Sequence, residues 1–200
     1  MAKPDGMSVT EIVAFVLGVL NVTLVVRRSL WNYPFGLVMV ALYAWVFFEA
    51  KLYSDALLQI FFCVVQIYGW VNWARNASQE GEVKVERMAN RGRVSWLGGA
   101  VIAILLWGWG MHRFTDAAFP WWDACVAILS VVAQILMSRR LIENWVLWVA
   151  VDFLAIGLYL AKDLRLTALL YAIFLALSLW GLIGWRNAER RTTPALGGPR

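Results

Sequence analysis

The sequence predicts an all-α membrane protein with seven transmembrane helices. Of the 200 residues, 62% are hydrophobic and 16% are charged, whereas a soluble domain carries roughly 25% charged residues. A spanning helix needs about 20 mostly apolar residues. Seven runs of that kind occur, in residues 8–26, 31–49, 55–74, 95–112, 121–138, 144–161 and 166–185. The breaks between them carry the charges, at residues 27–28, 51, 75–93, 113–116, 139–140 and 162–165.

One block of the sequence occurs twice, and both copies are strongly apolar. A single offset of 112 positions relates Arg27 to Arg139, Arg28 to Arg140, Asn32 to Asn144, Leu42 to Leu154, Phe62 to Phe174, Gly69 to Gly181 and Trp73 to Trp185. We therefore predict a first three-helix repeat in residues 8–76 and a second in residues 120–188. Residues 95–112 form a linker helix between them, which gives a 3+1+3 arrangement.

The odd linker helix determines how the repeats are related. After one extra crossing, the second repeat enters the membrane in the same orientation as the first. The repeats are thus predicted to be parallel, about an axis along the membrane normal, as in the SWEET sugar facilitators. The other segments are an N-terminal segment 1–7, a polar loop 77–94 that reads as a solvated linker, and a tail 189–200 that we expect to be disordered.

Lysine and arginine predict the orientation in the membrane. Thirteen of them fall on the side of the C-terminus and five on the opposite side. The positive-inside rule then predicts a cytoplasmic C-terminus and an external N-terminus, in the cell (inner) membrane. These cations are spread over short loops rather than gathered on one element, which argues against a nucleic-acid partner.

The sixth run carries a polar stripe. Asn144, Trp148, Asp152 and Tyr159 follow one another at steps of four, four and seven residues, which places them on one helical face. An isolated carboxylate in a membrane span costs about 2.5–3.5 kcal/mol even on a mild scale. The stripe suits a polar or cationic aromatic ligand, through stacking, cation–π contacts and hydrogen bonds. Alternatively, Asp152 pairs with another buried polar group and only holds helices together.

Three other runs carry further polar stripes. Gln59, Gln66 and Trp70 belong to the third, Asp123, Ser130 and Gln134 to the fifth, and Tyr171 and Ser178 to the seventh. Helix–helix hydrogen bonding is the favoured role of Gln59, Ser130 and Ser178, and for Gln66 both roles stay open. Four stripes together favour a hydrated central cavity. The candidate substrate-binding residues are Gln66, Trp70, Gln134, Asn144, Trp148, Asp152, Tyr159 and Tyr171.

No signal for an enzyme is found. His112 is the only histidine, and Cys63 and Cys125 lie in apolar runs without a neighbouring cysteine or histidine. The sequence has no zinc-ligand spacing, no nucleophile motif and no phosphate-binding loop. We therefore expect no catalytic site, no metal, no cofactor and no coupling to ATP.

Several motifs resemble the PnuC family of vitamin transporters. They are Phe119-Pro120-Trp121-Trp122-Asp123, Glu143-Asn144-Trp145 with Trp148, Asn32-Tyr33-Pro34-Phe35-Gly36 and Tyr68-Gly69-Trp70. The resemblance covers about residues 8–188. It implies the 3+1+3 fold with SWEET-like halves and downhill, facilitated uptake of a vitamin, most often nicotinamide riboside. A cytoplasmic kinase then traps the vitamin by phosphorylation, as a metabolic and not a physical partner. The family's ligand contacts match Gln66, Asn144, Trp148 and Tyr171 here.

The cargo stays open within this resemblance. Carriers of nicotinamide riboside can show asparagine at the position of Asp152. An ionised Asp152 would suit nicotinamide riboside or thiamine, because both are cations. A membrane assembly protein without transport and a membrane enzyme are further hypotheses, and the first of these predicts polar stripes that pack without a cavity. A homo-oligomer is compatible with the sequence.

Overall fold

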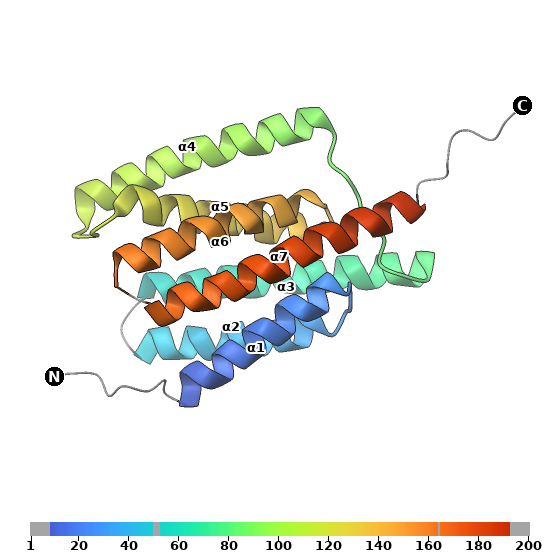
Figure 1. The fold of residues 1–200 in the computed structure, drawn as a ribbon, viewed down its shortest axis with the longest axis horizontal. Coiled ribbons are helices and arrows are strands. Elements are labelled where there is room, and N and C mark those ends of the chain that lie inside the picture. The colour runs from blue at the N-terminus through green and yellow to red at the C-terminus, as the bar shows by residue number, and fades with distance from the viewer. Residues whose placement is uncertain (1–8, 50–52, 164, 193–200) are drawn as a thin grey trace, which may run out of the picture.

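The computed structural model describes residues 9–49, 53–163 and 165–192, which form seven helices (Figure 1). They are α1 (Val9–Val26), α2 (Asn32–Glu49), α3 (Tyr53–Glu80), α4 (Asn90–Phe114), α5 (Pro120–Ser138), α6 (Glu143–Ala161) and α7 (Arg165–Thr192). The predicted all-α class is confirmed. Within the described ranges, α4, α5, α6 and the stretch Thr167–Arg191 are long and apolar enough to cross a membrane, and Val16–Val26 is a shorter apolar stretch.

Two turns of the same form end α1 and α5. Arg28 and Arg140 have positive φ angles of 56° and 60°, which non-glycine residues rarely adopt. In the first turn, the Arg28 N–H donates to Val25 O and the Ser29 N–H to Leu24 O, both at 2.9 Å. The second turn repeats both bonds 112 positions later. This is the Schellman pattern of a helix C-terminus, with arginine at the left-handed position.

The amide side chains of Asn32 and Asn144 hold the next helices to these turns. Asn32 Nδ2 donates to the carbonyl of Ser29, and Asn144 Nδ2 donates to the carbonyl of Leu141, each at 2.6 Å. Both asparagines are buried at the first turn of their helices. The repeated Arg-Arg and Asn positions of the sequence therefore specify the same local structure twice.

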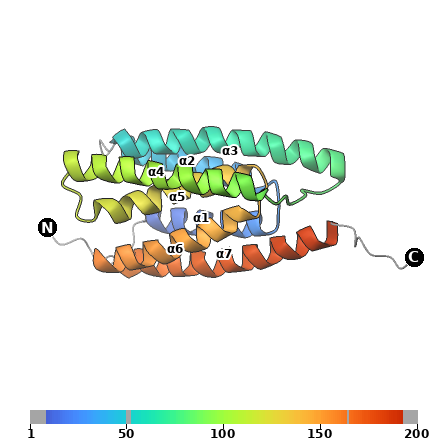
Figure 2. The ribbon, with the colours of Figure 1, turned by 90° about the horizontal axis from the view of Figure 1, so that it is seen from above.

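Six helices pack side by side in a closed ring. α1 packs on α2, α2 on α3, α3 on α5, α5 on α6, α6 on α7, and α7 on α1. Among the described residues, α4 packs on α5 and lies outside the ring (Figures 1 and 2). In Figure 1, α1, α3, α5 and α7 begin at the left end of the bundle, and α2, α4 and α6 begin at the right end. We call the right end, with turns 27–31 and 139–142 and loop 81–89, the turn end.

An aromatic cluster fills the ring near the turn end. Tyr33, Trp73, Trp145 and Trp185 are all at most 1% exposed. Tyr33 meets Trp73 edge-on at 5.4 Å between ring centroids, and Trp145 meets Trp185 edge-on at 5.6 Å. The middle of the cluster is the pair Trp73 and Trp185, 5.7 Å apart. We refer to these four residues as the aromatic cluster.

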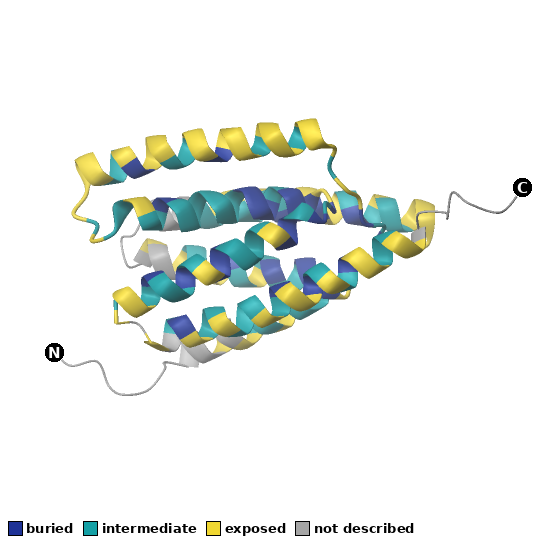
Figure 3. Cartoon of the chain, turned by 45° about the horizontal axis from the view of Figure 1, so that its top comes forward, coloured by how far each residue is buried: buried dark blue, intermediate teal, exposed yellow. Residues whose placement is uncertain are grey.

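Buried residues gather on the inward faces of the ring helices, whereas α4 is mostly exposed (Figure 3). Many of the exposed side chains of α4 are large and apolar, among them Val101, Ile102, Leu105, Leu106 and Trp107. A soluble protein rarely exposes so continuous an apolar surface. Lipid chains would cover it in a membrane.

The loop between α3 and α4 is shorter than the predicted polar loop 77–94, because α3 continues to Glu80 and α4 begins at Asn90. It also differs from the solvated linker that its charges suggest. Val83 and Val85 are buried, and Arg28 Nη1 donates to Val83 O at 2.9 Å. The Glu86 N–H donates to Arg140 O at 3.0 Å, and the Glu86 carboxylate pairs with the Arg140 guanidinium. Loop 81–89 thus connects the two equivalent turns.

The structure describes only a small part of the two predicted terminal segments. The predicted N-terminal segment 1–7 and residues 193–200 of the predicted tail lie outside the described residues. Residues 189–192 belong to α7.

Candidate functional site

A cavity of about 400 Å³ lies inside the ring. Each of the six ring helices contributes to its lining, and no lining residue comes from α4. Val25, Met137 and Trp145 belong both to this lining and to the hydrophobic core around the aromatic cluster. The aromatic cluster therefore adjoins the cavity on the side of the turn end.

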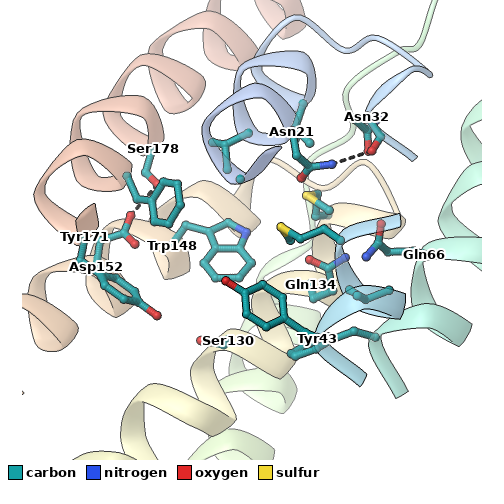
Figure 4. A pocket seen from close by; sticks show the side chains of 18 of the residues that line it. Asn21, Asn32, Tyr43, Gln66, Ser130, Gln134, Trp148, Asp152, Tyr171 and Ser178 are labelled. Carbon is teal, nitrogen blue, oxygen red and sulfur yellow. Dashed lines mark hydrogen bonds between the residues drawn. The ribbon is translucent and has the colours of Figure 1, made fainter. Parts of the chain in front are cut away.

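One side of the cavity is acidic and aromatic (Figure 4). Asp152 of α6 is 3% exposed, and its Oδ2 accepts a hydrogen bond of 2.7 Å from the Ser178 hydroxyl of α7. Asp152 forms no ion pair within the described ranges, and no described Lys, Arg or His lines the cavity. The ring of Tyr171 lies beside Asp152 (Figure 4). Among the described residues, the hydrogen-bond partner of this carboxylate is a neutral hydroxyl.

The opposite side is lined by neutral amides (Figure 4). Gln66 of α3 and Gln134 of α5 are buried, and neither side chain donates to or accepts from another described residue. Asn21 Nδ2 donates to the carbonyl of Asn32 at 2.5 Å. A Cβ on Gly36 would collide with the Gln66 and Asn21 side chains, so glycine is what leaves room for both amides. These amides offer donors and acceptors to a polar ligand.

Trp148 and Tyr43 lie between the acidic side and the amide side (Figure 4). Trp148 comes from α6, one turn before Asp152, and Tyr43 comes from α2. An indole face attracts a cationic ring by a cation–π contact and also stacks on a flat ring. The cavity therefore offers an aromatic surface next to a negative charge, with neutral hydrogen-bonding groups across from it.

The cavity follows the sequence repeat but is not symmetric in chemistry. Seven pairs of lining positions are 112 residues apart: Gly18 and Ser130, Val22 and Gln134, Val25 and Met137, Val40 and Asp152, Gln59 and Tyr171, Phe62 and Phe174, and Gln66 and Ser178. Asp152, the single acid among the described lining residues, corresponds to Val40 in this pairing. The two copies have thus diverged in the residues that give the cavity its charge.

Five of the eight candidate residues line the cavity: Gln66, Gln134, Trp148, Asp152 and Tyr171. The other three lie near it. Asn144 binds the carbonyl of its own turn. Tyr159 stacks on the ring of Tyr171 at 5.2 Å, outside the lining. Trp70 is 39% exposed and stacks on Tyr33.

Several lining residues were not among the candidates. Asn21 was missed, although an amide within an apolar run is the same signal that singled out Gln66. Tyr43 carries no such signal, since tyrosine is common in membrane helices. Gln59, Ser130 and Ser178, for which helix contacts were favoured, also line the cavity. Ser178 lines the cavity and also links two helices, because its hydroxyl on α7 donates to Asp152 on α6.

The chain matches a known family over nearly its whole length. The sequence model of the nicotinamide mononucleotide transporter family matches residues 8–187. The chain belongs to this family. The nicotinamide riboside transporter PnuC of Escherichia coli K12 is 32% identical, over 92% of this chain and 87% of that protein. The riboflavin/roseoflavin transporter RibM of Streptomyces davaonensis is 29% identical, over 94% and 90%.

A solved structure of the family has the same fold. The crystal structure of the vitamin B3 transporter PnuC superposes with a TM-score of 0.73 at 30% identity, over 90% of this chain and 82% of that one. The resemblance to PnuC transporters is therefore confirmed. Family membership and the apolar helices make the chain a multi-pass membrane protein of a transporter family.

Proposed function

We propose that this transporter carries nicotinamide riboside across the inner membrane by facilitated diffusion. The observation that supports this cargo most directly is the buried carboxylate of Asp152, which faces a cavity without any described cation. Nicotinamide riboside joins a positively charged pyridinium carboxamide to a ribose. A cationic ligand offsets the cost of keeping a carboxylate in a membrane span. The E. coli relative also carries this vitamin in its name.

The cavity has a partner for each part of this vitamin. The pyridinium ring stacks on Trp148 with its charge toward Asp152, where charge and ring face reinforce each other. The ribose hydroxyls and the carboxamide form hydrogen bonds with the side-chain amides of Gln66, Gln134 and Asn21, which lie across the cavity from Asp152. A hydrogen bond to a charged group contributes about 1.5–3 kcal/mol, and a neutral one about 0.5–1.5 kcal/mol. Asp152 is thus expected to dominate affinity, and the amides to select the sugar.

The negative charge of Asp152 and the lack of a described cation in the cavity disfavour binding of the phosphorylated vitamin. A phosphate is usually bound by arginine, lysine or a helix N-terminus, and no described cation lines this cavity. Asp152 would also repel it. Phosphorylation by a cytoplasmic kinase therefore converts a cation that enters the cavity into a product that does not return through it. This accounts for net uptake without an ion gradient or ATP.

Thiamine is the second candidate, because Asp152 and Trp148 also suit a thiazolium cation. It lacks the ribose, so it would leave the amide side of the cavity with fewer partners. The Streptomyces relative is named as a riboflavin transporter. Riboflavin has no permanent positive charge that could pair with Asp152.

The proposed mechanism uses two parallel repeats. The first spans residues 8–76 and the second residues 120–188, with α4 as the linker helix. The ring contacts support this arrangement, because exchanging α1 with α5, α2 with α6 and α3 with α7 leaves the set of contacts unchanged. Movement of one repeat against the other exposes a central site alternately to each side. The aromatic cluster acts as the closed gate at the turn end, which the distribution of Lys and Arg assigns to the cytoplasm.

Calorimetric titration of the purified protein tests this proposal. Nicotinamide riboside is expected to bind most tightly, thiamine more weakly, and riboflavin and nicotinamide mononucleotide weakest. Tighter binding of riboflavin would overturn the assignment of a cationic cargo. Tighter binding of the mononucleotide would overturn the charge argument.

A further inference from the structure

A second hollow, of about 560 Å³, lies outside the ring at the turn end. Its walls come from α4, α5, α6 and α7 and from the end of loop 81–89. It shares no residue with the central cavity. We call it the lateral groove. α4 packs on α5 but not on α6 or α7 among the described residues, so the groove is the space that α4 leaves beside these two helices.

The groove is basic at its turn end. Four arginines line it, namely Arg87, Arg93, Arg186 and Arg190, together with one acid, Glu143. Arg93 pairs with Glu143 at 2.7 Å, and Arg87 pairs with Glu189 at 2.6 Å. Arg186 and Arg190 are exposed and form no ion pair with a described residue. Within the described part of the chain, two positive charges of the groove therefore have no ion-pair partner.

The rest of the groove is apolar. Its walls are formed by Trp96, Leu97, Ala100, Leu129, Val132 and other apolar side chains of α4 to α7. Trp96, Leu97 and Ala100 follow Arg93 along α4, and Leu129 and Val132 belong to α5. Both helices are long and apolar enough to span a membrane. The groove thus has charged walls where a membrane has headgroups and apolar walls where it has acyl chains.

We propose that the lateral groove binds an anionic phospholipid. Its phosphate pairs with Arg186 and Arg190, and its acyl chain lies along α4 and covers the walls of α5, α6 and α7. Basic pockets between membrane helices on the cytoplasmic side bind anionic headgroups in this way. A soluble anion would leave the apolar walls unused. A zwitterionic lipid would bring its own cation to the groove together with its phosphate, so that the net positive charge of the groove would not be reduced. The proposal goes beyond the transport function and depends on neither the cargo nor the central cavity.

The bound lipid would join α4 to α6 and α7. A ligand that binds only the folded state stabilises it in proportion to the logarithm of its concentration over its dissociation constant. The site is therefore expected to raise the thermal stability of the protein, while nicotinamide riboside bound in the central cavity leaves lipid affinity unchanged.

The test compares lipids with identical acyl chains on the purified full-length protein in detergent. Native mass spectrometry counts bound phosphatidylglycerol and phosphatidylcholine, and thermal unfolding is followed with each lipid and with inorganic phosphate. We expect one tightly held phosphatidylglycerol and a raised unfolding temperature with this lipid only. Equal binding of both lipids would overturn the proposal. A rise with inorganic phosphate equal to that with phosphatidylglycerol would reduce the site to a simple anion site and overturn it too.

Paired variants locate the site. Arg186→Gln combined with Arg190→Gln should weaken phosphatidylglycerol binding about 30-fold, at roughly 1 kcal/mol per arginine. Arg75→Gln combined with Arg191→Gln removes the same charge from exposed positions outside the groove and should retain the wild-type affinity. An equal loss in both pairs would show a general surface charge effect and overturn the assignment. Because the native mass measurement on the unaltered protein needs no variant, poor folding of either pair leaves the proposal testable.

Discussion

The indoles of Trp73 and Trp185 each donate a hydrogen bond to the opposite half of the molecule. Trp73 Nε1 donates to the carbonyl of Met137 at 3.1 Å, and Trp185 Nε1 donates to the carbonyl of Val25 at 3.3 Å. Donors and acceptors are both related by the 112-residue offset. The two bonds are thus one interaction made twice, and they hold the end of α3 to α5 and the end of α7 to α1.

Replacing either tryptophan by phenylalanine tests this equivalence. Trp73→Phe and Trp185→Phe each remove one indole hydrogen bond, which contributes about 0.5–1.5 kcal/mol. The carbonyls of Met137 and Val25 still accept the N–H of Arg140 and of Arg28. We expect similar losses in the free energy of unfolding for the two variants, measured by denaturant titration in detergent. Trp180→Phe on α7, at a position that is 46% exposed, should change it by no more than about 0.5 kcal/mol. A large difference between Trp73→Phe and Trp185→Phe would contradict the reciprocal arrangement.

Gly181 and Gly184 form a matched pair on α7. A Cβ on Gly181 would lie 2.5 Å from Cζ2 of Trp145, whereas a Cβ on Gly184 would meet nothing within 4 Å. Gly181→Ala should lower the free energy of unfolding by about 1–3 kcal/mol, because the indole must move in a packed core. Gly184→Ala should be neutral or stabilising by up to about 1 kcal/mol, since alanine favours the helix. Thermal unfolding in detergent distinguishes them, and equal effects would argue against the Trp145 contact.

The helices and turns could be predicted because they depend on local or repeated signals. Apolar runs give the helices, and the offset that relates Arg28 to Arg140 predicts two turns of one form. Loop 81–89 could not be predicted in this way. Its alternating charges read as solvated, while Val83 and Val85 are buried only because distant turns lie beneath them. Sequence patterning does not report such contacts.

The sequence predicts which face of α6 lines the cavity, but not how far along the helix the lining extends. Helical periodicity places Asn144, Trp148, Asp152 and Tyr159 on one face of α6. Trp148 and Asp152 of this face line the cavity inside the ring. At about 1.5 Å per residue, however, Asn144 lies about 12 Å from Asp152 along the axis, and Tyr159 about 10 Å beyond it on the other side. The face therefore runs from the turn, through the cavity, to the packing of Tyr159 on Tyr171. Helical periodicity determines on which side of the helix a residue lies. It does not determine how far along the helix axis a cavity extends.

The orientation in the membrane leads to a simple prediction. Thirteen of the 18 Lys and Arg residues fall on the side of the C-terminus, so the positive-inside rule expects that side to stay in the cytoplasm. Green fluorescent protein fused after Arg200 should fluoresce, and alkaline phosphatase fused at the same place should be inactive. Active phosphatase would reverse the topology and assign the aromatic cluster to the outer side.

Asp152→Asn is the sharpest test of the cavity. Asparagine keeps the size of the side chain and an oxygen that accepts the bond from Ser178, so the fold should be retained. The change removes the negative charge that faces the ligand. Binding of nicotinamide riboside should weaken by about 1–3 kcal/mol, as expected for loss of a charge-assisted hydrogen bond. Calorimetric titration of both proteins, after their unfolding temperatures have been compared, measures this difference.

Two controls separate the charge from other effects. Asp123→Asn makes the same substitution on α5 outside the cavity, where the carboxylate pairs with Lys162 at 2.7 Å, and should leave binding unchanged. Dihydronicotinamide riboside has nearly the shape of the vitamin but an uncharged ring. It should bind the unaltered protein more weakly than the cation does, and should lose little further affinity in Asp152→Asn, because the lost interaction needs charge on both partners. If Asp152→Asn weakened both ligands equally, Asp152 would act by shaping the cavity through Ser178. A cation-selective site requires that Asp152→Asn weaken binding of the cation much more than binding of the uncharged ring.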